Sequence, residues 1–328
     1  MKARWEAVSL CLWAVLGILA PADVLAASPG DPVAILTEIK PGQGEIRVKA
    51  AAEADWKAPL PLLSLRAGDQ VRATGNATAV LMFTGGQGVV TVAAGNSPYT
   101  VQAQAAPPAG GGGRTQGLVA NVSRILAGKK KELTYVPLAV RGVKQPPLLL
   151  SPREGKLLGP PVLEWAGSDR LRYMVRVLGP QGLVWEQSNL SRAPLPYPAG
   201  APRLLSGIPY RWELEVRDFA PQRGLFTILR PEEIVKVRET LSALAPSALS
   251  GYPKNTVILM RAGFLFEQEL YVEARKELQT AIAADPDEPN LHLMLGHVYE
   301  RTGLKELAAE EFDEAQFLVS SSAPAPKP

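Results

Sequence analysis

Residues 255–288 read NTVILMRAGFLFEQELYVEARKELQTAIAADPDE, and residues 289–322 follow directly as PNLHLMLGHVYERTGLKELAAEEFDEAQFLVSSS. When the two stretches are aligned, small residues match small residues and large residues match large ones. Small residues at fixed positions let two helices approach closely, and large residues interlock between them. The pattern therefore predicts two similar helical hairpins. The equivalent pairs are Ile258 and His292, Ala262 and Gly296, Leu265 and Tyr299, Ala274 and Ala308, Leu278 and Phe312, and Ala281 and Ala315.

A repeat of this length, built from two amphipathic helices, resembles the tetratricopeptide repeat. The second stretch matches the repeat better, because Arg261 and Glu269 replace the usual leucine and glycine in the first. Two repeats leave an end of the stack uncovered. An apolar stripe from Ile234 to Leu244 predicts one more helix that caps it, so the expected helical region is 231–322.

The resemblance implies a module that binds other molecules and carries no chemistry of its own. In the repeat family, the inner face of each first helix lines a groove for an extended peptide. The groove positions in this chain also include Thr256, Gly263 and Glu267. The residues expected to contact a protein or peptide partner are Leu259, Phe266, Asn290, Leu293, His297, Glu300 and Arg301.

The charge of the helical region bears on its partner. Residues 254–319 hold thirteen acidic and six basic side chains, and 6 − 13 gives −7. An acidic surface favours a basic partner, which includes the chain's own basic stretch. The alternative is that this charge only keeps a small helical domain soluble.

The first 26 residues are typical of an export signal peptide. Lys2 and Arg4 precede an apolar run, residues 8–20, and small residues follow near Ala26. The run is shorter than the roughly 20 residues that cross a bilayer as a helix, although a retained short anchor is the alternative. The chain's single cysteine, Cys11, lies inside the run, so the mature chain has no thiol for disulfides, metal binding or catalysis. The expected location is the periplasm.

Residues 32–104 show the alternation and turn spacing of a small all-β domain. Alternating apolar residues predict a strand at Ile46 and Val48 and a hairpin over residues 79–92. The segment 65–75, LRAGDQVRATG, and the opening GEIRV at residues 44–48 resemble the FecR domain of bacterial envelope proteins. Gly85 stands where an aspartate is usual. The founding family signals through a membrane helix that this chain lacks, so the resemblance implies only the fold and the envelope location.

Residues 105–147 combine a glycine-rich linker, a short predicted helix and a basic stretch. The basic residues in and beside it, Arg124, 129–131, Arg141, Lys144, Arg153 and Lys156, exceed the acidic ones by six. One interpretation is contact with a cell-wall polymer or an anionic membrane surface. The other is a solvated helix end, and no aromatic residues are interleaved that would favour nucleic acid.

Residues 148–229 predict a second β domain. Strands are expected around residues 162–165, 173–177, 184–186 and 210–216, and the last alternates apolar and charged residues as a sandwich strand does. This pattern resembles a fibronectin type III or immunoglobulin-like domain. Its tryptophans suggest either core packing or a sugar platform, and Trp185 is the one expected to be most exposed.

No catalytic, cofactor or metal motif is found. His292 and His297 are five residues apart on one helix, so they cannot hold one metal as an i, i+4 pair does. The acidic residues Asp285, Asp287 and Glu288 lack the spacing of a calcium-binding loop. Residues 323–328 contain too few apolar side chains to fold and predict a disordered tail. The sequence therefore favours a non-enzymatic, exported scaffold that binds protein through its repeats. The alternatives are a peptidoglycan- or glycan-binding protein and a ligand sensor that uses the first β domain.

Overall fold

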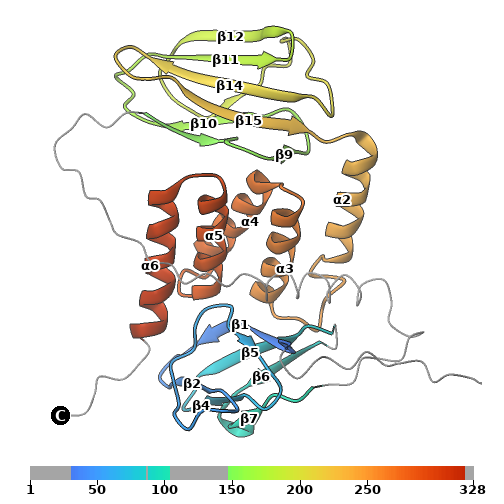
Figure 1. Ribbon diagram of the computed structural model, residues 1–328, viewed down its shortest axis with the longest axis vertical. Helices are drawn as coiled ribbons and strands as arrows, with labels where there is room; N and C mark the ends of the chain where they lie inside the picture. The colour runs from blue at the N-terminus through green and yellow to red at the C-terminus, as the bar shows by residue number, and fades with distance from the viewer. Residues whose placement is uncertain (1–30, 86–87, 104–146, 322–328) are drawn as a thin grey trace, which may run out of the picture.

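The computed structural model describes residues 31–85, 88–103 and 147–321. Within them, an N-terminal β module (31–103) and a sandwich module (147–229) lie at opposite ends of a helical module (230–321), as Figure 1 shows. The expected fold class, two β modules followed by helical hairpins, is confirmed. The predicted leader and tail, and the predicted linker up to residue 146, lie outside the described residues.

The N-terminal β module consists of two facing antiparallel sheets. One sheet has the strand order β3-β1-β5-β6 and the other β2-β4-β7. The predicted hairpin is confirmed, because β5 pairs with β6 over residues 79–92. The elements are β1 (Ala34–Lys40), β2 (Ile46–Lys49), β3 (Ser64–Leu65), β4 (Gln70–Ala73), β5 (Thr78–Phe83), β6 (Val89–Val92), the 3₁₀ turn η1 (Ala94–Asn96) and β7 (Tyr99–Thr100).

The glycine–aspartate segment forms the turn that leads into β4. Gly68 has φ +90°, a left-handed conformation that favours glycine. The Asp69 carboxylate then accepts hydrogen bonds from the main-chain N–H groups of Ala51 (2.9 Å) and Arg66 (2.8 Å). These bonds fix two loops against each other, which explains why this position needs a short acidic side chain.

Strand β1 is the structural centre of this module, and the sequence analysis did not predict it. It lies between β3 and β5, and six of its seven residues are buried. Leu36 packs between the two sheets, whereas Ile35 joins the apolar core of the helices. The register shifts between Leu36 and Glu38, and such a bulge re-aims side chains. As a result, Thr37 and Glu38 both bond to the helical module.

The sandwich module pairs a three-stranded sheet, β13-β10-β8, with a five-stranded sheet, β12-β11-β14-β15-β9. The four predicted strands are present as β10, β11, β12 and β14. Trp165 and Trp212 are buried, so core packing is confirmed for both. The strands are β8 (Leu148–Ser151), β9 (Lys156–Leu157), β10 (Val162–Ala166), β11 (Tyr173–Gly179), β12 (Gly182–Leu190), β13 (Leu195–Pro196), β14 (Pro209–Val216) and β15 (Gln222–Ile228).

The helical module contains the two predicted hairpins and the capping helix. The close approach expected at a small residue is present, because a Cβ atom added to Gly296 would lie 2.3 Å from the Phe312 ring. Glycine here lets α5 and α6 pack at short range. The helices are α2 (Pro231–Ala243), α3 (Lys254–Glu267), α4 (Tyr271–Ala284), α5 (Pro289–Arg301) and α6 (Lys305–Ser321).

Helix α2 lies beside α3 at the expected end of the stack, but it covers this end only sparsely, because Val237 is its one buried residue and joins the apolar core of both hairpins. Arg261, which departs from the repeat pattern, has a structural role in this contact. Its guanidinium donates to the Leu241 carbonyl (2.7 Å) and to the Glu277 carboxylate (2.5 Å), so it ties α2, α3 and α4 together. Among the described residues, no helix is both long enough and apolar enough to cross a membrane.

Candidate partner-binding surface

The structure places the predicted groove residues in three different environments. Helices α3 and α5 lie inside the module, and most of their side chains are covered by the chain itself. Leu259, Asn290 and His297 are buried, together with Thr256 and Gly263. Phe266, Leu293 and Glu300 are half-buried, while Glu267 and Arg301 are exposed. The N-terminal half of the predicted face is therefore covered, and its C-terminal half reaches the surface.

Strand β1 covers the start of α3. The Glu38 carboxylate accepts hydrogen bonds from the Thr256 N–H (3.1 Å) and the Thr256 hydroxyl (3.2 Å). The Thr37 hydroxyl lies 2.9 Å from the same Thr256 hydroxyl. The first N–H groups of a helix have no partner within the helix and favour a negative charge. Glu38 supplies that charge from a different module.

The start of α5 is held to β1 in the same way. Glu288, which is 1% exposed, accepts from the Ile39 N–H (3.2 Å) and from the Asn290 side-chain amide (2.7 Å). The Asn290 side-chain oxygen in turn accepts from the Leu62 N–H (2.5 Å). The groove position Asn290 and its neighbour Glu288 thus bind main-chain groups of the turn at Leu62 and of strand β1, both within this protein.

The buried carboxylates are electrostatically coupled. Burial raises the pKa of Glu288 to about 8, and the nearby Glu38 charge adds to this, while hydrogen bonds from Asn290 and Ile39 oppose it. Lys40 lies at the edge of the cluster, 3.2 Å from the Asp285 carboxylate and 3.7 Å from that of Glu38. Burial lowers the pKa of Lys40, but these acidic partners outweigh it and the net pKa is raised. We name Thr37, Glu38, Thr256, Glu288 and Asn290 the inner joint.

The opposite ends of the helices contact the sandwich module. The Lys156 N–H donates to the Glu269 carbonyl (2.8 Å), and the Arg153 Nε donates to the Thr302 carbonyl (2.8 Å). The Lys156 ammonium also pairs with the Glu269 carboxylate at 3.2 Å, so two cations of the predicted basic stretch are engaged within the chain. Arg301 pairs with Glu154 at 3.1 Å, and both side chains are about half exposed. We name Arg153, Glu154, Lys156, Glu269, Arg301 and Thr302 the outer joint.

Trp185 is the most exposed of the three sandwich tryptophans, as expected, but it does not form a flat open platform. Its ring meets Tyr197 edge-on, with the centroids 5.4 Å apart at 66°. It is half-buried, whereas Trp165 and Trp212 are buried. The geometry favours packing at the rim of the sandwich.

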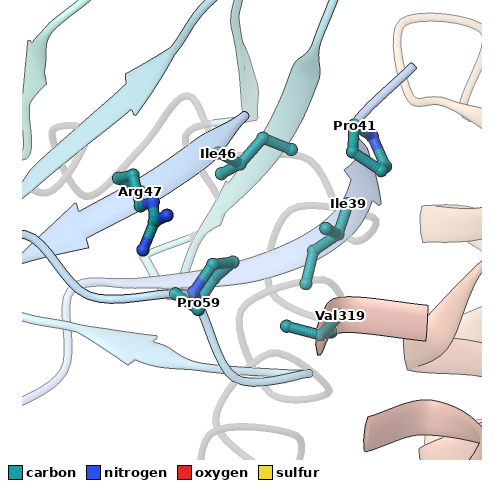
Figure 2. A pocket seen from close by; sticks show the side chains of 7 residues that line it. Ile39, Pro41, Ile46, Arg47, Pro59 and Val319 are labelled. Atoms are coloured by element: carbon teal, nitrogen blue, oxygen red, sulfur yellow. The ribbon is translucent and has the colours of Figure 1, made fainter. Parts of the chain in front are cut away.

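One small hollow lies where the last turn of α6 meets the N-terminal β module. Figure 2 shows Ile39, Ile46 and Val319 converging on it, with Arg47 and Pro59 at its rim. Its volume, about 10 Å³, is close to the minimum that one water molecule needs. The hollow is a packing gap and too small for an organic ligand.

The two histidines serve separate contacts. His292 bonds through Nδ1 to the Glu311 carboxylate (2.7 Å) and through Nε2 to the Pro286 carbonyl (2.8 Å), which joins α6 to the turn before α5. His297 packs edge-on against Phe312, 5.3 Å between ring centroids. Within residues 31–85, 88–103 and 147–321, no three His, Cys, Asp or Glu side chains are grouped as a metal would require.

Sequence reasoning missed the partners that β1 supplies to the inner joint. Thr37 and Glu38 are polar residues inside an otherwise apolar run, and that interruption was the available indication. In comparisons with known proteins, no family model and no curated protein matches the chain.

Proposed function

We propose that this protein is a non-enzymatic interaction scaffold of the bacterial cell envelope, exported to the periplasm, that binds a protein partner through its helical repeats. The export proposal is supported by residues 1–26, which have the order of charges, apolar run and small residues of a signal peptide. The resemblance of residues 32–104 to the FecR domain is consistent with the same location.

The observation that supports binding most directly is the inner joint. Side chains at the start of α5 already hold main-chain groups of the N-terminal β module. Asn290, at a groove position, binds the Leu62 N–H in a turn, and Glu288, just before α5, binds the Ile39 N–H of the extended strand β1. Main-chain hydrogen bonds of this kind do not depend on the sequence of the bound segment. The same two helices continue to the surface at Glu267 and Arg301, where a second extended segment would contact them.

The proposal that the protein is not an enzyme is supported by the use of its buried acids. Glu38 and Glu288 are both buried, but each one accepts main-chain N–H groups at the start of a helix. A buried carboxylate with a raised pKa often indicates a catalytic acid. In this protein a structural role accounts for the two buried acids, because Glu38 and Glu288 hold the N-terminal β module to the helices.

Site-specific photocrosslinking in the native host tests this proposal. A photoreactive residue replaces either Glu267 or Arg301 on the first-helix face, or Lys276 or Glu310 on the exposed sides of α4 and α6 as matched controls. We expect one protein, identified by mass spectrometry, to crosslink from the first pair of positions and not from the controls.

Two results would contradict the proposal. One is equal crosslinking from all four positions, which would mean that the first-helix face is not selective. The other is the absence of any protein adduct combined with sedimentation of the purified protein with peptidoglycan. That second result would favour the glycan-binding alternative.

A further inference from the structure

The five-stranded sheet of the sandwich module has two edges that differ in how they are covered. At one edge, β9 pairs with β15, and the Lys156 N–H there bonds to the Glu269 carbonyl of the helical module. At the other edge, β12 pairs only with β11 and lies at the end of the molecule farthest from the helices (Figure 1). The first edge is closed and the second is open.

Strand β12 is unusually accessible for its length. None of its nine residues is buried, and Leu183 is 55% exposed. Across the described residues, no main-chain hydrogen bond reaches its outer side. In natural proteins, lysine, proline or irregular pairing commonly prevents an edge strand from pairing with a strand of another chain. Residues 182–190 contain neither lysine nor proline, and their irregularities are the register shifts that flank residues 185–187 and the positive φ (+59°) of Asn189.

The outer face of the sheet carries a row of charges that alternate in sign. Reading inward from the open edge, the cross-strand partners are Glu186, Arg176, Glu213 and Arg223. Arg176 lies 3.3 Å from Glu186, and Arg223 lies 3.0 Å from Glu213. Opposite charges on neighbouring strands stabilise a sheet. Glu186 ends this row at the open edge. A strand added there would continue the alternation with a lysine or arginine opposite Glu186.

The next row, on the face that packs against the other sheet, is apolar. It runs from Trp185 at the edge through Val177 to Trp212. Val177 and Trp212 are fully buried, whereas Trp185, at the edge, is half-buried with Tyr197 edge-on against its ring. A strand added at this edge therefore needs an apolar residue beside Trp185.

We propose that the open edge of β12 binds an extended strand of a separate protein, in which an apolar residue pairs beside Trp185 and a lysine or arginine pairs with Glu186. Main-chain hydrogen bonds to the edge supply the affinity, and the alternation of apolar and basic side chains supplies the selectivity. This surface is distinct from the helical repeats, and neither proposal depends on the other.

Binding of a synthetic peptide to the full chain tests this inference. The probe is a labelled nine-residue peptide in which valine alternates with threonine or lysine, measured by fluorescence anisotropy. We expect saturable binding that is lost when the peptide main chain is N-methylated. Glu186→Lys should weaken binding about five-fold, since an attractive cross-strand pair becomes repulsive. The same substitution should favour a peptide with glutamate in place of lysine.

Glu310→Lys is the matched control, because it makes the same charge change at an exposed position on α6. Equal weakening by both substitutions would overturn the inference, since net charge alone would then explain binding. Unchanged binding of the N-methylated peptide would overturn it as well. A dimer in sedimentation that Glu186→Lys dissociates would identify a second copy of the chain as the occupant and would also overturn it.

Discussion

The inner and outer joints connect the two β modules to the same helices through groups that differ in exposure, although the sandwich module also makes an ion pair with α4, between Glu164 and the buried Arg275. At the inner joint, the interacting groups are buried, and Glu288 and Asn290 are almost fully removed from solvent. At the outer joint, Arg301 and Glu154 remain 45% and 51% exposed. A buried polar group without a partner costs far more than a solvated one. Loss of a hydrogen-bond partner should therefore cost more free energy at the inner joint than at the exposed ion pair of the outer joint.

The difference shows that a repeat face can act as a structural joint. The positions at the start of α3 and α5 to which the repeat resemblance assigns a foreign peptide instead hold β1 and the loop before β3. Glu38 lies at the N-terminus of α3, where the helix dipole also favours a negative charge. The N-terminal β module should consequently behave as part of the helical fold.

The largest expected effect is on the pH dependence of stability. The pKa of Glu288 is near 8 in the folded protein, against an ordinary value of 4.5. The folded state thus holds this proton more tightly than the unfolded chain, and the free energy of unfolding should fall as pH rises from about 4.5 to about 8. The expected slope is up to roughly 1.4 kcal/mol per pH unit. Denaturant unfolding across this range measures it.

Glu288→Gln is the control for this pH dependence, because it keeps a hydrogen-bond acceptor and removes the titration. A smaller slope should remain from His292 and from Glu273, whose pKa is also raised by burial. Burial lowers the pKa of His292, but the bonds to Glu311 and the Pro286 carbonyl outweigh it and raise the pKa above 6.5. The stability that His292 contributes is complete below pH 6.5 and is lost as pH rises through the folded pKa. An unchanged slope in Glu288→Gln would contradict this assignment.

The next largest effect is expected for Asn290→Ala at the inner joint. This change leaves the Leu62 N–H without its acceptor and removes one donor to Glu288. We expect the free energy of unfolding to fall by about 3 kcal/mol, because both groups are buried. A decrease of less than about 1 kcal/mol in the free energy of unfolding would mean that water enters the inner joint and solvates the groups left without a partner.

Arg153→Ala at the outer joint should have an intermediate effect. The half-buried guanidinium donates to the Thr302 and Leu149 carbonyls, at 2.8 and 2.7 Å. Loss of these charge-assisted bonds should cost about 1 to 2 kcal/mol in denaturant unfolding. A cost equal to that of Asn290→Ala would remove the contrast between the two joints.

The smallest effect is expected for Arg301→Ala, also at the outer joint. Arg301 pairs with exposed Glu154 and lies over the Tyr271 ring at 5.5 Å. Exposed ion pairs contribute little, so the loss should be under about 1 kcal/mol and should shrink further at high salt. A larger loss that salt does not change would show that this pair is effectively buried.

The hairpins were predictable because their pattern is local and repeated. The positions of Gly296 and Phe312 followed from the size of the residues at equivalent places in both repeats. The four best-marked sandwich strands followed from alternation in the same way. By contrast, β15 was not predicted, although it is seven residues long and pairs with β14 over residues 222–227. Its interruption by Gly224 weakens the apolar alternation.

Strand β1 was missed for a different reason. Its residues are buried on both faces, so the alternation that marks a half-exposed strand is absent. The burial of Asn290 and Leu259 was likewise not predictable from residues 255–322 alone. A groove position looks the same in the sequence whether a foreign peptide or the chain's own strand fills it.

Native-state hydrogen exchange of the β1 and α3 amides tests the central claim, that the N-terminal β module is held as part of the helical fold. The comparison is between the natural chain and Asn290→Ala, read at the Ile39 and Thr256 amides, which bond across the inner joint. We predict that both amides lose protection together, each by about 100-fold, as about 3 kcal/mol implies. If the Ile39 amide keeps its protection while the Thr256 amide loses it, the two modules open independently and the account is contradicted.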